Sequence, residues 1–410
     1  TENLTSEGYF SYVKDFKGGH NLNATAGYSY FEVNGENFGM DNYNFSVDGI
    51  KYWDIGQGSY LTDGKAGMSS GKSVTERLFS FFARANYSYQ DKYMLSASIR
   101  HEGSSKFAAD NRWANFWSAT AGWRISNEEF MKDFDWLDDL KIRFGYGVTG
   151  NNDFSATYMA NMLGSDTNWM MPNGTWAYSY GKSQNVNPNL GWEEKKEWNL
   201  GVDYSFFEGR LYGKFDYYRR KVDNLLFSVK VPQPPYTQGS QMQNIGSMES
   251  KGWEFEVGGD IIRTKDFTWS SSMNLSHNTG KILTLEGDNS YHNGNGFVAP
   301  GTPGDAARME AGSTIGSFYM WKFAGFDDEG SFLLYNKDGE VIPAAQKTEN
   351  DKQYIGNYTP KLIIGWSHTL TYKNFDLGIN LRSWIDFDVY NTINMYYGIQ
   401  GQGNLNVLKD

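Results

Sequence analysis

Ten residues in the middle of the chain, Glu197-Trp198-Asn199-Leu200-Gly201-Val202-Asp203-Tyr204-Ser205-Phe206, carry its strongest structural signal. Every second side chain from Trp198 to Phe206 is apolar, and those between are small, polar or charged. Successive side chains of a β-strand point to opposite faces, so this period of two predicts a strand with one apolar and one polar face. Soluble strands usually span five or six residues, whereas a tilted strand needs about 9–11 to cross a bilayer. The stretch therefore favours a membrane-crossing strand.

The same alternation recurs on both sides of this stretch. It is found at residues 22–30, 79–89, 93–102, 117–125, 140–148, 211–219, 252–261, 267–275, 362–372 and 375–385. Short turns, such as 373–374, alternate with long polar segments, such as 150–193 and 278–317. Counting a weaker pair at 318–326 and 331–335 gives about fourteen strands. Short turns at one end and long loops at the other are typical of outer-membrane barrels, with the turns in the periplasm and the loops outside the cell.

Composition excludes several other classes of protein. The 410 residues include no cysteine, which excludes a disulfide scaffold, a thiolate zinc site and a cysteine nucleophile. With 37 basic and 48 acidic residues and a net charge of -11, the chain has no cation excess for phosphates, so no nucleic-acid partner is expected. No run approaches the roughly 18 apolar residues of a membrane helix, which excludes a helical membrane protein.

A soluble all-β protein would also show alternating strands. A propeller would carry a sequence repeat of about 40–50 residues, and none is found. A sandwich fits poorly because full charges occupy one entire face of long, regular strands, as in Glu254, Glu256 and Asp260. We therefore predict an all-β protein, a transmembrane antiparallel β-barrel.

Motifs that suggest chemistry lack the required context. Gly67-Met68-Ser69-Ser70-Gly71 has the spacing of a hydrolase nucleophile elbow, but it lies in a Gly/Ser-rich loop with no strand before it and no helix after it. The five histidines are scattered, and the carboxylate pairs fall at strand ends and turns, where solvated charge is usual. The sequence thus predicts no catalytic residue, no metal site, no cofactor and no enzyme.

Several motifs resemble those of one family, the SusC/RagA family of TonB-dependent transporters. The matching stretches run from Tyr93 through Gly103-Ser104-Ser105-Lys106-Phe107 to Asn111-Arg112-Trp113, and include Gly122-Trp123-Arg124-Ile125-Ser126, Tyr146-Gly147-Val148-Thr149-Gly150-Asn151, Asn187-Pro188-Asn189-Leu190-Gly191-Trp192-Glu193, Asn244-Ile245-Gly246, Tyr354-Ile355-Gly356-Asn357 and Asp388-Val389-Tyr390-Asn391. The resemblance covers most of the chain.

The resemblance implies an outer-membrane barrel of about 22 strands, a size whose lumen is filled by a plug. Residues 1–410 would then be the central and later part of the barrel, with the plug domain, the TonB box and the final strands outside this chain. It further implies active import of oligomeric nutrients, mostly oligosaccharides and sometimes peptides. The implied partners are a SusD-like surface lipoprotein, the TonB-ExbB-ExbD complex, and lipid or lipopolysaccharide.

Three other interpretations stay open at this stage. One is a peptide importer of the same family, and another is a passive porin or adhesin barrel without energy coupling. The third is an outer-membrane barrel enzyme, for which no Ser/His or Asp/His set is apparent. An upstream plug and TonB box would argue against the passive barrel.

Aromatic and amide side chains in the predicted loops are candidates for substrate binding. Flat rings suit the faces of sugars, and amides suit their hydroxyl groups. The candidate residues are Trp53, Tyr60, Trp169, Asn173, Trp176, Tyr178, Tyr291 and Phe297. The alternative is that these side chains pack the loops together or against the lipoprotein.

Overall fold

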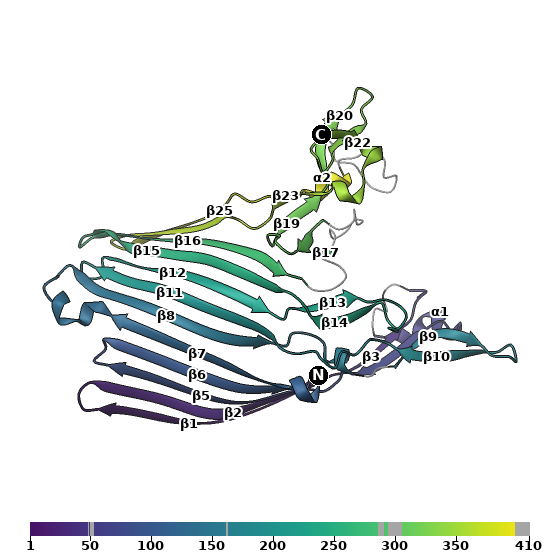
Figure 1. The fold of residues 1–410 in the computed structure, drawn as a ribbon, viewed down its shortest axis with the longest axis horizontal. Helices are drawn as coiled ribbons and strands as arrows, with labels where there is room; N and C mark the ends of the chain where they lie inside the picture. The colour runs from purple at the N-terminus through teal and green to yellow at the C-terminus, as the bar shows by residue number, and fades with distance from the viewer. Residues whose placement is uncertain (48, 50–52, 161–162, 286–290, 294–305, 398–410) are drawn as a thin grey trace.

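One antiparallel sheet of twelve strands forms most of the molecule (Figure 1). The computed structural model describes all of residues 1–410 except 48, 50–52, 161–162, 286–290, 294–305 and 398–410. In spatial order the strands are β1 (Glu2–Phe16), β2 (His20–Asn34), β5 (Glu76–Tyr89), β6 (Tyr93–Ser104), β7 (Trp113–Arg124), β8 (Leu137–Asn151), β11 (Glu193–Phe206), β12 (Leu211–Asp223), β15 (Ser247–Arg263), β16 (Phe267–Thr284), β24 (Leu362–Tyr372) and β25 (Phe375–Ile385). The strands predicted from the alternation are all present in this sheet.

Short turns connect the strands at one end of the sheet, which we call the turn side. Gln90 and Asp91 between β5 and β6 have φ angles of 52° and 53°, a left-handed geometry typical of tight hairpin turns. The one longer connection on this side, between β7 and β8, forms two short 3-10 turns, η4 (Ile125–Asn127) and η5 (Glu129–Met131). The predicted alternation of short and long connections is confirmed.

The long connections lie at the opposite end, the loop side, and contain small sheets of their own (Figure 1). The loop-side strands are β3 (Glu36–Asp41), β4 (Gly67–Lys72), β9 (Leu163–Met170), β10 (Trp176–Lys182), β13 (Leu226–Lys230), β14 (Ser240–Asn244), β17 (Tyr291–Asn293), β18 (Arg308–Glu310), β19 (Ser317–Met320), β20 (Lys322–Phe326), β21 (Phe332–Tyr335), β22 (Val341–Pro343) and β23 (Gln353–Asn357). The helical segments are η2 (Ile55–Gln57), α1 (Ser59–Thr62), η3 (Ala109–Asn111), η6 (Ala156–Met159), η7 (Ala344–Gln346), η8 (Glu349–Asp351) and α2 (Thr392–Tyr397). No helix among the described residues has both the length and the apolar character needed to cross a membrane.

The expected strand count of about fourteen is too high for the described residues. The pair expected at 318–326 and 331–335 lies outside the large sheet, where β20, β21 and β22 form a separate three-stranded sheet and β19 pairs with β23. The reason is that β16 pairs directly with β24 from Phe267 to Ser276, which leaves no free edge between them. β20 and β21 have five and four residues, too few to cross a bilayer.

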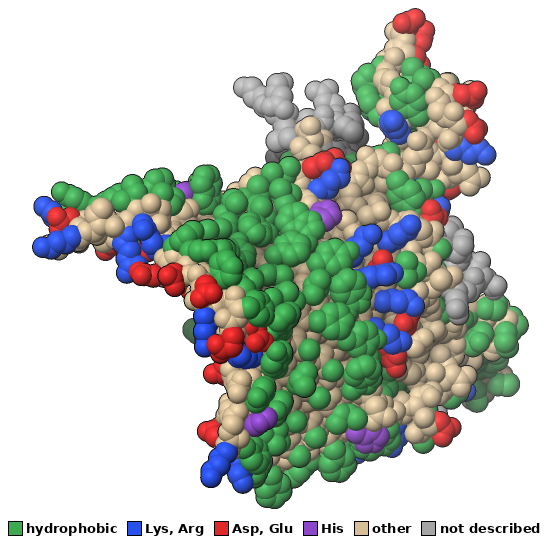
Figure 2. All heavy atoms as spheres, turned by 60° about the vertical axis from the view of Figure 1, so that its left-hand side comes forward, with side chains coloured by type: hydrophobic (Ala, Val, Ile, Leu, Met, Phe, Trp, Pro, Cys, Tyr) green, Lys and Arg blue, Asp and Glu red, His purple; other side chains and the backbone are tan. Residues whose placement is uncertain are grey.

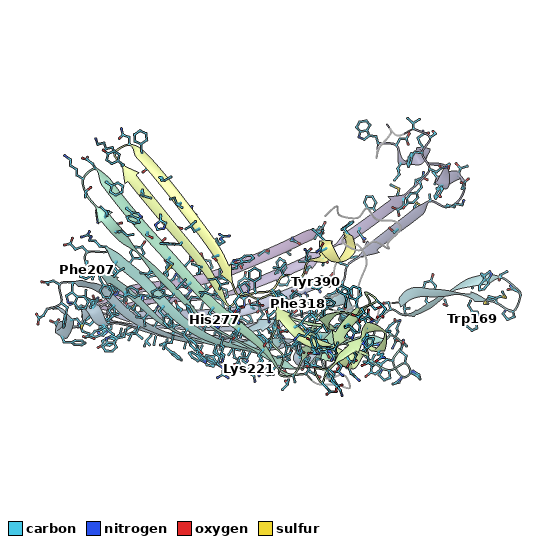
Figure 3. All side chains as sticks on the ribbon, turned by 90° about the horizontal axis from the view of Figure 1, so that it is seen from above. Trp169, Phe207, Lys221, His277, Phe318 and Tyr390 are labelled. Atoms are coloured by element: carbon cyan, nitrogen blue, oxygen red, sulfur yellow. The ribbon has the colours of Figure 1, made fainter. Side chains whose placement is uncertain are left out.

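The strand register separates the side chains of the large sheet into two faces. One row of directly opposed residues is Phe10, Ala26, Ala83, Ile99 and Trp117. The adjacent row is Ser11, Thr25, Arg84, Ser98 and Ser118. We call these the apolar face and the polar face. Figure 2 shows the broad hydrophobic surface that results, and Figure 3 shows that the sheet is curled rather than flat.

Aromatic side chains lie at both ends of the apolar face. On β11 the belt residues are Trp198 toward the loop side and Phe206 toward the turn side, eight residues apart. At about 3.3 Å per residue this is about 26 Å along the strand, or about 20 Å across the membrane at a usual barrel tilt. The spacing agrees with an apolar band between two aromatic girdles.

Candidate functional site

Buried side chains are concentrated at the loop-side rim of the sheet. The main hydrophobic cluster there is formed by Phe107, Phe116, Val148, Phe154, Leu190 and Trp192. Leu190 is fully buried, and Phe107 is 2% exposed. The ring of Trp192 lies 5.0 Å from that of Phe107 and 5.2 Å from that of Phe116, measured between centroids. This rim cluster therefore holds the loops after β6, β8 and β10 against the top of the sheet.

Asparagine side chains fasten a further loop to the rim cluster. Asn244 accepts a hydrogen bond from the backbone N–H of Gly191 at 2.7 Å and donates one to the carbonyl of Gly191 at 2.9 Å. Asn187 donates to the carbonyl of Met242 at 3.0 Å, and Asn185 donates to the carbonyl of Ser240 at 2.9 Å. These bonds satisfy loop backbone groups that water would otherwise solvate. The segments around 185–191 and 240–244 therefore behave as one fixed platform.

Below the rim, the polar face carries a charge network across β8, β11 and β12. The guanidinium of Arg143 makes two hydrogen bonds of 2.8 Å to the carboxylate of Asp203 and reaches Asp216 at 3.2 Å. Lys141 also contacts Asp203 at 3.0 Å. A Cβ on Gly201 would lie 2.6 Å from both Arg143 and Asp216, so glycine there allows the guanidinium to cross between strands. The polar face, which we also call the polar wall, thus carries several charged side chains held in place by one another.

A hollow of about 570 Å³ lies on this wall toward the turn side. Its lining includes Asn86, Ser96, Lys141, Arg143 and Asn199. Apolar residues such as Val13, Met94 and Ala121 also line it, so the hollow combines polar and apolar surface. The described residues include no group of three His, Asp or Glu side chains that could hold a metal ion.

The β9–β10 hairpin carries four of the predicted substrate-binding residues, Trp169, Asn173, Trp176 and Tyr178, on a ribbon that projects from the rim (Figure 3). The side chains of Trp169 and Trp176 are 66% and 63% exposed. Trp169 lies opposite Ala177, and Trp176 lies opposite Met170, so the two indoles point to opposite faces of the ribbon. Asn173 is committed to its own turn, where its side-chain oxygen accepts bonds from the N–H and hydroxyl of Thr175. Trp169, Asn173 and Trp176 are therefore neighbours without forming one surface.

Two other predicted residues lie in the connection between β3 and β4. Trp53 is 72% exposed. Tyr60, in α1, is half-buried against Tyr43, with ring centroids 5.6 Å apart, and Lys65 lies over its ring at 5.4 Å. Tyr60 thus packs within its own loop, whereas most of the Trp53 side chain is exposed to solvent.

Three predicted residues have side chains that the structure does not describe. Phe297 and the side chains of Tyr178 and Tyr291 lie outside the described residues. The backbone of Tyr178 lies opposite Asn168 in the ribbon, and that of Tyr291 lies opposite Glu310 in the β17–β18 pair. The eight candidates therefore come from three separate loops and remain predictions.

Sequence reasoning missed the rim cluster as a feature of the site. Phe107, Leu190 and Trp192 belong to the family motifs, but no periodicity marks them as buried because they lie in loops. The sequence feature that indicates this cluster is the presence of large apolar residues inside polar loop motifs, as in Leu190-Gly191-Trp192. Such residues in a loop indicate a local core.

Comparison with known proteins identifies the family. Residues 1–399 match the family described as TonB dependent receptor-like, beta-barrel. TonB-dependent receptor P3 of Formosa agariphila is 33% identical over 95% of this chain and 39% of the relative. TonB-dependent receptor SusC of Bacteroides thetaiotaomicron is 34% identical over 80% of this chain and 33% of the relative. The chain thus spans 33–39% of the length of these two curated relatives.

A solved structure agrees with this assignment. The RagAB peptide importer in its closed-closed state superposes with a TM-score of 0.79 at 26% identity, over 94% of this chain and 41% of that one. The predicted resemblance to SusC and RagA is confirmed. The chain belongs to the TonB-dependent receptor-like β-barrel family, and its twelve-stranded sheet is an outer-membrane barrel wall.

Proposed function

We propose that the protein imports oligomeric nutrients, oligosaccharides in the first place, across the outer membrane with energy supplied through TonB. The observation that carries the proposal is the arrangement of the rim. A fixed platform of buried loop residues holds an exposed aromatic ribbon above a wall of fixed polar and charged groups. A solute can be captured at the mouth by flat rings and then pass along a hydrophilic surface.

The proposal includes two protein partners. A SusD-like lipoprotein would cover the loop side, where the long connections offer exposed apolar surface such as Phe323, Phe326 and Phe332. The TonB-ExbB-ExbD complex would supply energy from the periplasmic side. The names of the relatives, a SusC receptor and a RagAB importer, support this assembly. The lipid partner is the bilayer that covers the apolar face. No chemistry on the solute is proposed, because the relatives are named as receptors and importers.

Peptides are the second candidate substrate. The similarity to the RagAB peptide importer favours them, with a TM-score of 0.79. Exposed indoles also bind apolar side chains, so Trp169 and Trp176 suit either substrate. A passive porin is disfavoured because the family is that of TonB-dependent receptors.

Separate substitution of the two ribbon indoles tests the capture step. Because Trp169 and Trp176 point to opposite faces, we expect Trp169→Ala and Trp176→Ala to differ in effect, with one of them weakening capture. Loss of one stacked ring should cost roughly 1–3 kcal/mol, or tenfold or more in affinity. Calorimetric titration of the intact receptor with its lipoprotein, using defined oligosaccharides and defined peptides in parallel, measures this.

Met171→Ala, in the turn of the same ribbon, is the matched control and should leave affinity unchanged. Growth on the same substrates should be measured separately, because energy-driven release can hide an affinity loss. If both indole variants bind as the parent protein does while the lipoprotein stays docked, the ribbon is not the capture site. If peptides bind and oligosaccharides do not, the second candidate replaces the first.

A further inference from the structure

A cluster of cations lies on the apolar face, immediately above the loop-side aromatic belt. The strand register places five basic residues in two adjacent rows across β11, β12, β15 and β16. They are Lys196, Arg219, Lys221, Lys251 and Lys281. In the lower row Trp198 lies opposite Arg219, which lies opposite Lys251. We call this set the basic cluster. Figure 2 shows basic side chains bordering the hydrophobic surface.

The row below the basic cluster is apolar and aromatic. It consists of Phe144, Leu200, Tyr217, Trp253 and His277, each opposite the next. The rings of Trp198 and Tyr217 lie 5.5 Å apart between centroids. Rings of this kind mark the level of the lipid headgroups. The cations therefore lie at the headgroup level of the leaflet on the loop side, which faces outside the cell. Lys221 and His277 mark the two levels in Figure 3.

Carboxylates on the same face neutralise part of the cluster. Glu249 forms an ion pair with Arg219 at 2.5 Å. Asp223 forms ion pairs with Lys221 at 2.7 Å and with Lys196 at 3.2 Å. Glu194 also lies 3.3 Å from Lys196. Three carboxylates therefore form ion pairs with three of the five cations. Lys251 and Lys281 are exposed, and neither has an ion-pair partner among the described residues. The cluster keeps an excess of two positive charges.

Within the described part of the chain, the carboxylates of the barrel leave two cations of the basic cluster without compensation. Lys196 and Lys221 are directly opposed on neighbouring strands, where like charges repel, but Asp223 contacts both and offsets that repulsion within the chain. Elsewhere near this end of the apolar face a cation is paired, as where Arg77 on β5 contacts Glu32 on β2 at 2.8 Å. Lys251 and Lys281, the two cations without an ion-pair partner among the described residues, lie on the adjacent strands β15 and β16. An external anion that contacts both of these lysines would neutralise the excess charge.

We propose that the basic cluster binds the phosphate groups of a phosphorylated lipid in the outer leaflet. The lipid's acyl chains would lie along Leu200, Val202 and Phe255 below the aromatic belt, and its phosphates would contact Lys251 and Lys281. Charge complementarity at headgroup height and the continuous apolar surface beneath it point to one amphiphile. This site is independent of the import proposal, since it lies on the opposite face of the sheet from the polar wall.

Native mass spectrometry of the intact receptor in detergent tests the site. The probes are bisphosphorylated lipid A, the same lipid with both phosphates removed, and inorganic phosphate. The parent protein should bind the bisphosphorylated lipid at least fivefold better than the dephosphorylated one. Lys251→Gln with Lys281→Gln should remove most of that preference, and Lys251→Arg with Lys281→Arg should retain it.

The matched control is Lys214→Gln, which lies on the polar face of β12 and contacts Glu256 at 3.0 Å, and it should leave binding unchanged. Inorganic phosphate at millimolar concentration should displace little lipid, because the chains contribute to binding. Equal binding of the two lipids, or unchanged preference in the double glutamine variant, overturns the proposal. Full displacement by inorganic phosphate also overturns it and leaves a simple anion site. Shifted gel mobility of heated against unheated samples verifies that each variant is folded.

Discussion

At the scale of single residues, burial has different consequences on the two sides of the sheet. Leu200 lies on the apolar face between Phe144 and Tyr217, while Asn199 points to the polar face. We expect Leu200→Arg to destabilise the barrel by about 2–4 kcal/mol, because the charge would lie in hydrocarbon. Denaturant titration of the refolded receptor in lipid vesicles measures the change. Asn199→Arg is the control and should be mild. Equal losses for both variants would contradict the assignment of the faces.

Leu190 provides the matching prediction at the rim. Its side chain is fully buried in the rim cluster, so Leu190→Ala should cost about 2–5 kcal/mol locally through the cavity it leaves. Hydrogen exchange of residues 187–192 and 240–244 should accelerate, because Asn244 couples the two segments. Leu200→Ala, on the apolar face, should leave exchange at the rim unchanged. If the rim amides of Leu190→Ala exchange as slowly as those of the parent protein, the rim cluster does not hold the loops.

At the scale of elements, the antiparallel strands place the long connections at one end of the sheet and the short turns at the other. The β9–β10 ribbon and the turn between β24 and β25 are at opposite ends of the sheet (Figure 1). We expect an epitope tag inserted after Asn173 to bind antibody on intact cells and one after Asn374 to bind only after permeabilisation. The reverse labelling would invert the topology and place the basic cluster in the inner leaflet.

The loop element around η8 responds to acid. Asp351 accepts hydrogen bonds from the hydroxyl of Thr348 at 2.7 Å and from its backbone N–H at 2.8 Å, and these bonds hold the pKa of Asp351 below its usual value. A lowered pKa in the folded state means stabilisation that is complete above the ordinary carboxyl pKa and is lost as the pH falls through the lowered value. Protection of the Thr348 and Lys337 amides should therefore fall under acid. Asp351→Asn should show the same loss already at neutral pH, and pH-independent protection in the parent protein would refute this.

At the scale of the whole molecule, the sequence predicts the barrel wall better than the loops. Strands such as β11 follow from a period of two, because each side chain has one of two environments. Residues 318–335 also alternate, yet they form small loop-side sheets, since pairing depends on which edges are free. The candidate site residues were chosen by chemistry alone. Sequence could not show that Trp169 and Trp176 face apart, because that depends on the register of the ribbon.

The rim cluster has a consequence for how such a protein diversifies over generations. Its buried contacts fix the bases of the loops, while the β9–β10 ribbon lies beyond them with most of each indole in water. If the ribbon captures the solute as proposed, mutations in it change recognition at little cost in folding, whereas mutations in the platform destabilise the protein whatever the nutrient. Under that proposal, a lineage that meets a new nutrient would replace the ribbon and inherit the rest of the barrel intact.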